Sequence, residues 1–157
     1  MRRKPVVAVL LLSLCVAVAL TARHARAQSR AADERYAELV GLRLAEFALV
    51  NGKVTDAVAR VVANPGILDV DNGFRDELAE RAHQARAILG EIRDLRPGGQ
   101  TRDAHRLLDC AATQYETYYA ALLKAMDAWT DETPSLLLNL SRDASVTFNT
   151  YLARVPR

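Results

Sequence analysis

Beyond about residue 30, apolar side chains recur every three or four positions, which is the spacing of one face of an α-helix. A turn-like Asn51-Gly52 dipeptide lies inside the first such segment, yet the apolar phase continues unchanged on both sides of it. The pattern therefore predicts one long helix over about residues 30–63, with Gly52 as the position for a bend. Its apolar face comprises Tyr36, Val40, Phe47, Val50, Val54, Val58 and Val61.

A second helix is predicted over about residues 72–95. Asn64-Pro65-Gly66 separates it from the first, because proline cannot continue the hydrogen-bond ladder and glycine accepts left-handed geometry. The stretch Asp69-Val70-Asp71-Asn72 offers N-cap oxygens for its first turn. Its apolar face comprises Phe74, Leu78, Ala85, Ile88, Leu89, Ile92 and Leu95.

Two more helices are predicted over about residues 101–130 and 134–154. Pro97-Gly98-Gly99 ends the preceding helix, and Thr101 offers a cap for the next one. Thr133-Pro134 restarts the chain with a cap followed by proline at the first helical position. The third helix shows an apolar face of Leu108, Ala111, Ala112, Tyr115, Tyr119, Leu122, Met126 and Trp129. The fourth shows Leu136, Leu137, Leu140, Ala144, Thr147, Phe148, Tyr151 and Val155.

No stretch shows the sustained alternation of a half-buried strand, so the chain is predicted to be all-α. Four amphipathic helices with short connections favour an antiparallel up-down-up-down four-helix bundle. This bundle forms one domain over residues 28–157 and is preceded by an N-terminal signal-peptide helix.

The first 27 residues have the three parts of a secretory signal peptide. A basic start is followed by an apolar run over residues 6–20, and Ala25-Arg26-Ala27 supplies a small-x-small cleavage site. The apolar run is short for a bilayer span, which needs about 20 residues. Cleavage after Ala27 therefore predicts an exported chain, periplasmic or extracellular. The alternative is an uncleaved inner-membrane anchor over residues 6–22, because positive charge after the apolar run resists translocation.

Removing this segment changes the charge of the protein. The chain of 157 residues carries 21 basic and 19 acidic residues, a net charge of +2. Five basic residues and no acidic ones lie in the first 27, so the rest carries 16 basic and 19 acidic residues, a net charge of −3. A mildly acidic domain without a basic run argues against a nucleic-acid partner. Only Cys110 remains after cleavage, so no disulfide within the chain is expected.

The sequence lacks the common catalytic and cofactor-binding patterns. Haem-attachment, phosphate-loop and zincin patterns are missing from the sequence. One Glu-x-x-His half-site occurs at Glu80 and His83, but a di-iron centre needs two, and His83 falls opposite the apolar face. His105 and Asp109 are one turn apart and predict a hydrogen bond on the helix surface. We expect no metal, no cofactor and no enzymatic activity.

Arg43 and Arg81 are positions where the residue disagrees with the pattern. Each lies in the apolar seam of its helix, where an unpaired guanidinium would cost several kcal/mol. One interpretation is an internal salt bridge, or a long stem that reaches water. The other is a small anionic ligand held between helices by Arg43 or Arg81 together with the hydroxyls of Tyr115 and Tyr151.

Apolar residues off the main faces point to a different kind of site. Leu42, Leu49, Leu138 and Val146 fall outside the apolar faces of their helices, and several such residues on adjacent helices indicate a dimer or partner surface. Aromatic residues gather in the last two helices, where an exposed group would form a further partner-binding patch. They are Tyr115, Tyr118, Tyr119, Tyr151 and Trp129.

The stretch over residues 85–119, ARAILGEIRDLRPGG followed by HRLLDCAATQYETYY, resembles exported bacterial helical-bundle proteins and lipoproteins of unknown function. Their helices end in an Ile-Arg-x-Leu-x-Pro-like segment, and the next helix opens with His-x-Leu-Leu. The lipidation cysteine of the lipoproteins is missing here. The resemblance implies an exported bacterial bundle and brings no catalytic residues.

These observations together predict a non-enzymatic protein interaction module that binds another protein or associates with itself. The alternative is a sensory domain for a small anionic ligand near Arg43 or Arg81. Membrane contact is expected only if the signal segment is not cleaved.

Overall fold

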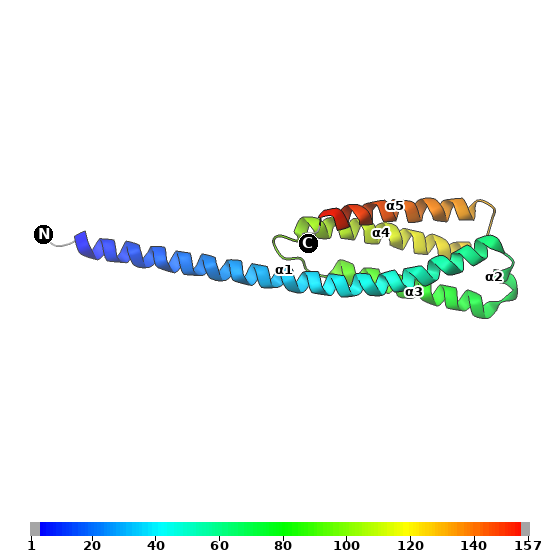
Figure 1. The fold of residues 1–157 in the computed structure, drawn as a ribbon, viewed down its shortest axis with the longest axis horizontal. Helices are drawn as coiled ribbons and strands as arrows, with labels where there is room; N and C mark the ends of the chain where they lie inside the picture. Colours follow the sequence, from blue (N-terminus) through cyan, green and yellow to red (C-terminus); the bar gives the residue numbers. More distant parts are fainter. Residues whose placement is uncertain (1–3, 155–157) are drawn as a thin grey trace.

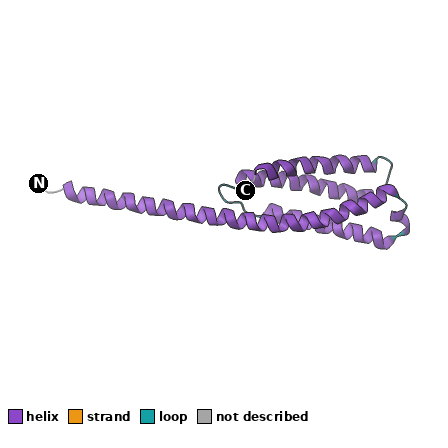
Figure 2. Ribbon diagram, in the orientation of Figure 1, coloured by secondary structure: helices purple, strands orange, loops and turns teal. Residues whose placement is uncertain are grey.

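The computed structural model describes the backbone of residues 4–154 and the side chains of residues 27–154. This part of the chain is helical between short connections and contains no strand, which confirms the all-α prediction (Figure 2). A short helix, α2 (Ile67–Val70), was not expected. The four long helices are α1 (Lys4–Ala63), α3 (Asn72–Asp94), α4 (Arg102–Ala125) and α5 (Thr133–Arg154).

The four long helices alternate in direction along the chain (Figure 1). Helix α1 packs against α3, α3 against α4, and α4 against α5. The remaining pair of neighbours, α1 and α5, is in looser contact than these three pairs. The side of the helical body between α1 and α5 is therefore its most open side.

One apolar core runs through the helical body, because each long helix turns its three-and-four spaced side chains inward. Aromatic rings fill its middle. The Phe47 ring meets the Tyr115 ring edge-on with centroids 5.1 Å apart, and the Tyr119 ring at 6.4 Å. The Tyr119 hydroxyl donates a 2.7 Å hydrogen bond to Oδ1 of Asn51, so this buried phenol keeps a polar partner.

Helix α1 begins at Lys4 and not at about residue 30, and it passes Asn51-Gly52 without interruption. No glycine or proline lies between residues 20 and 35, and the alanines and arginines there favour helix, so nothing ends the helix at the expected cleavage site. The side chains of residues 1–26, including the alternative anchor over residues 6–22, lie outside the described residues. Among the side chains described, no helix is long and apolar enough to span a bilayer.

The other helix ends follow the predictions with two differences. Asp71 caps α3 as expected, since its Oδ1 accepts a 2.9 Å hydrogen bond from the Phe74 N–H. Helix α4 ends at Ala125, about five residues earlier than predicted, in a stretch where Asp127 forms an ion pair with Arg75 of α3. Thr133 is the first residue of α5 and not its cap, and its hydroxyl accepts a 3.1 Å hydrogen bond from the Thr130 N–H.

A buried aspartate ties the loop between α3 and α4 to α1. Oδ1 of Asp33 accepts hydrogen bonds from the Thr101 hydroxyl at 2.9 Å and from the Thr101 N–H at 3.3 Å. Thr101 occupies the N-cap position of α4, as predicted. Its side chain does not cap the helix, because its hydroxyl donates to Asp33 instead. Gly98 lies so close to the carboxylate that an added Cβ would be 2.0 Å from Oδ1. The sequence pattern did not single out Asp33.

Candidate functional site

Arg43 is exposed and already paired. Its guanidinium donates a 2.7 Å hydrogen bond to Glu46 on α1 and forms a 2.9 Å ion pair with Glu91 on α3. The hydrogen bond with Glu46, followed by the charge of Glu91, raises the pKa of the guanidinium. Arg43 thus links two helices at the surface, and not inside the apolar seam where the pattern placed it.

Arg81 is half-buried and forms an ion pair with Glu77, one turn earlier on α3. It lines a small cleft of about 130 Å³ together with Lys53 and Arg60. The Arg60 guanidinium lies 4.6 Å from the centre of the Phe74 ring, a cation–π contact. The anion-binding hypothesis requires a guanidinium that has no acidic partner. Both Arg43 and Arg81 are paired with glutamates, so neither meets this requirement.

Tyr115 and Tyr151, the other two candidate ligand residues, are buried in the core. The Tyr115 hydroxyl lies 3.1 Å from Oγ of Ser145 on α5. The Tyr151 ring packs beside Phe148, with centroids 6.0 Å apart, and burial raises the pKa of its hydroxyl. The two arginines and the two tyrosines therefore contact different partners, and they do not converge on one site.

The predicted hydrogen bond between His105 and Asp109 does not form. Nδ1 of His105 lies 2.8 Å from the Tyr36 hydroxyl of α1, and Asp109 accepts a 2.8 Å hydrogen bond from Arg93 of α3. Both residues connect their helix to a neighbouring one because tertiary partners lie closer than the residue one turn away. His83 is exposed as predicted, and no metal-binding cluster occurs among the residues whose side chains are described.

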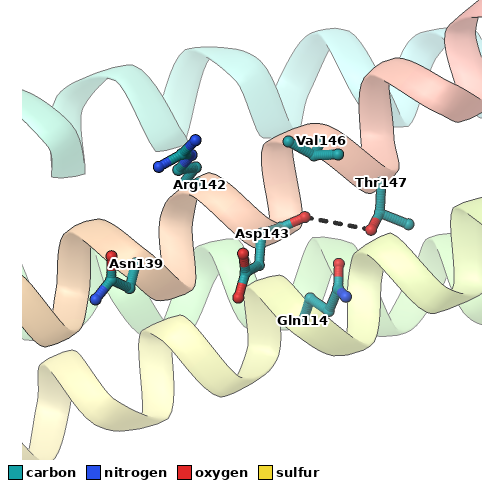
Figure 3. Close-up of a pocket in the computed structure, with 6 residues that line it drawn as sticks. All are labelled: Gln114, Asn139, Arg142, Asp143, Val146 and Thr147. Atoms are coloured by element: carbon teal, nitrogen blue, oxygen red, sulfur yellow. Dashed lines mark hydrogen bonds between the residues drawn. The ribbon is translucent and has the colours of Figure 1, made fainter.

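A polar cleft of about 670 Å³ lies on the outer side of α4 and α5 (Figure 3). Gln114, Asn139 and Asp143 turn their polar ends toward it, and Oε1 of Gln114 is buried without a hydrogen-bond partner. The Thr147 hydroxyl is already used within α5, where it donates to the Asp143 carbonyl at 3.2 Å. The cleft is open to solvent and can hold polar solutes by hydrogen bonds.

An apolar groove of about 290 Å³ lies on the opposite side of α5, between α5 and α1. Val58 and Val62 line it from α1, and Leu137 and Leu138 line it from α5. Tyr118 of α4 is part of its lining and is itself buried. Apolar side chains at this groove remain exposed, because α1 and α5 do not close over them.

The groove includes only some of the residues that the sequence predicted for a partner surface. Leu42, Leu49, Leu138 and Val146 are all exposed as predicted, but only Leu138 lines the groove. The four tyrosines of the aromatic group are buried and Trp129 is half-buried, so they form no exposed aromatic patch. The apolar pattern predicts Val58 as a core residue and does not single out Val62, so it does not predict the side of the groove that α1 forms.

Buried tyrosines make the stability of this region sensitive to alkaline pH. Burial raises the pKa of Tyr118 from the ordinary 10.0 to about 12, and it also raises the pKa values of Tyr36, Tyr119 and Tyr151. The folded chain keeps these phenols neutral where an unfolded chain ionises them. The contribution of these neutral phenols to the free energy of unfolding is fully present below pH 10. It is lost as the pH rises through about 12, the pKa of Tyr118 in the folded chain.

We therefore expect the free energy of unfolding to fall between pH 10 and pH 12, and to fall less steeply in Tyr118→Phe. Urea unfolding at a series of pH values measures this change, and phenolate absorbance reports the ionisation. A free energy of unfolding that stays constant across this interval would contradict the burial of these hydroxyls.

Searches against known protein families, characterised proteins and solved structures find no match to this chain. The resemblance to exported bacterial helical-bundle proteins stays a prediction.

Proposed function

We propose that this chain is an exported, non-enzymatic four-helix bundle that binds protein through the apolar groove between α1 and α5. The observation that carries the proposal is the exposure of apolar side chains at this groove, above all Leu138 with 68% of its surface exposed. Exposed apolar surface that continues across neighbouring helices favours a contact surface over a solvated one.

The chemistry of the groove fits an apolar protein segment better than a polar solute. Its walls are valine, leucine, alanine and proline, and its few polar groups are the hydroxyls of Thr55, Tyr118 and Ser141. No charged residue lines it, so recognition there would depend on burial of apolar area, which contributes about 25 cal/mol for each Å² removed from water.

The experiment that tests this function places a photo-crosslinking amino acid at position 138 in the native cell. We expect a discrete crosslinked product, because this side chain projects from the groove. The matched control is position 146 on the same helix, where Val146 is 60% exposed but lines the polar cleft. A product from position 146 alone, or no product from either position, would contradict the groove as the binding surface.

Export is the second part of the proposal, and it predicts the N-terminus of the protein that the cell contains. We expect the chain recovered from the exporting cell to begin at Gln28, because Ala25-Arg26-Ala27 has the small-x-small pattern of a cleavage site. N-terminal sequencing or intact mass measures this directly. A chain retained at full length in the membrane fraction would instead indicate the anchor over residues 6–22, and a cytosolic chain would contradict export.

A further inference from the structure

We infer that the polar cleft on the outer side of α4 and α5 binds a small neutral sugar, a mono- or disaccharide, through the side chains of Gln114, Asn139 and Asp143. The cleft lies on the opposite side of α5 from the apolar groove, so binding there is independent of the proposed function. The positions of these side chains, an unpaired oxygen of Gln114, the charge balance of the lining and the volume of the cleft support this site.

Two adjacent helices bring the three side chains to one cleft. Asn139 and Asp143 are one turn apart on α5, so they lie on the same face of that helix with their Cβ atoms about 6 Å apart. Gln114 reaches the cleft from α4, and the polar ends of all three side chains turn toward the space between the helices (Figure 3). Asn139 and Asp143 are exposed, and neither side chain makes a hydrogen bond or ion pair with another residue whose side chain is described. Their hydrogen-bonding groups are therefore available to a ligand.

Gln114 carries an unsatisfied hydrogen-bonding group. Its Oε1 is buried and has no hydrogen-bond partner among the residues whose side chains are described. Most buried polar atoms in native proteins are paired, so an unpaired amide oxygen beside a cleft points to a donor that the chain itself does not supply. The terminal torsion of a glutamine side chain is broad, and the amide can therefore turn its oxygen toward the cleft. A ligand hydroxyl there would donate the missing hydrogen bond.

The mixture of donors and acceptors at the cleft selects a ligand that has both. The Asp143 carboxylate only accepts hydrogen bonds, and the Arg142 guanidinium only donates them. The amides of Asn139 and Gln114 do both. Because the charges of Arg142 and Asp143 cancel, the lining carries no net charge. An ammonium ion offers only donors and a carboxylate only acceptors, whereas a hydroxyl donates and accepts, so a sugar fits this lining better than either ion.

Volume and lining separate this cleft from the other two. Sites for small molecules usually measure about 300–1,000 Å³, and the polar cleft measures about 670 Å³. The cleft that Arg81 lines is smaller, at about 130 Å³, and most of its lining residues are charged. The groove between α1 and α5 measures about 290 Å³, but its lining is mainly apolar. Of these three clefts, the polar one combines the room and the uncharged hydrogen-bonding groups that a sugar requires.

Titration followed by NMR spectroscopy tests the site. The full-length protein, labelled with ¹⁵N, is titrated with glucose, N-acetylglucosamine and sucrose, and with putrescine and acetate as charged comparisons at constant ionic strength. We expect at least one sugar to shift the side-chain amide resonances of Gln114 and Asn139 in a saturable way. The expected Kd is on the order of 1 mM, because no aromatic ring lines the cleft to stack on a sugar.

Substitutions identify the groups that bind. Asn139→Ala and Asp143→Ala should each weaken sugar binding about tenfold, because each removes hydrogen-bonding groups at an exposed position. The matched control is Asn149→Ala, since Asn149 is exposed on the same helix but does not line the cleft, and its Kd should stay unchanged. Gln114→Met should weaken binding without lowering the free energy of unfolding, because it removes a buried oxygen that has no partner. Circular dichroism verifies that each variant is folded.

Loss of binding in Asn139→Ala but not in Asn149→Ala would support the cleft as the site. No saturable shift with any of the three sugars up to about 100 mM, well above the millimolar range, would overturn it. Shifts that persist unchanged in both Asn139→Ala and Asp143→Ala would overturn it as well, and so would a response to putrescine or acetate alone. Crosslinking at position 138 reports on the groove and not on the cleft, so the proposed function and sugar binding can fail separately.

Discussion

Leu137→Ala is expected to lower the free energy of unfolding by about 3 kcal/mol, because it removes a core side chain and leaves a cavity. Leu137 is only 2% exposed and packs in the core beneath the groove. Urea unfolding followed by circular dichroism measures the loss, at a protein concentration low enough that association does not contribute.

The neighbours of Leu137 are natural controls, since three leucines follow one another on α5. Leu136 is 53% exposed and Leu138 is 68% exposed, so their replacement by alanine should change the free energy of unfolding by about 0.5 kcal/mol. Equal losses at positions 136 and 137 would mean that α5 is rotated from the orientation described. Leu138→Ala should weaken protein binding at the groove while leaving the chain nearly as stable as before.

Gly98→Ala is expected to cost about 2 kcal/mol, because the new methyl group would displace the Asp33 carboxylate from its hydrogen bonds. Oδ1 of Asp33 lies 2.0 Å from the position of an added Cβ, and the short side chain cannot move away without losing Thr101. The cost comes from lack of space and not from backbone strain, since Gly98 does not have a positive φ.

Gly99→Ala is the matched control for Gly98→Ala, because an added Cβ there meets only Oγ of Ser29 at an ordinary 3.6 Å. A double-mutant cycle identifies the cause. In an Asp33→Ala background, where the carboxylate is already absent, Gly98→Ala should cost much less than in the wild type. Equal costs in the two backgrounds would show that the contact with Asp33 is not responsible.

The two arginines show how far spacing alone can place a residue. The first helix was predicted to have Arg43 in its seam, but the neighbouring Leu44 packs against the core instead. On α3 the position beside Arg81 is filled by Ala82, which is fully buried. With a period of 3.6 residues, either of two adjacent positions can face the core at a given turn. The apolar residue faces the core in both helices, because burying a guanidinium costs more free energy than burying an apolar side chain.

The sequence alone determined the four long helical stretches beyond residue 30, though not α2, and, for most positions, which face of each helix is buried. It also located the Asp71 cap and the chain-breaking loops, because these features depend on residues within one turn of each other. Only the tertiary structure decided the partners of Arg43, His105 and Asp33, and the opening between α1 and α5. Those contacts depend on the rotation and axial position of one helix against another. Periodicity within a single helix does not contain that information, because many relative placements bury the same apolar face.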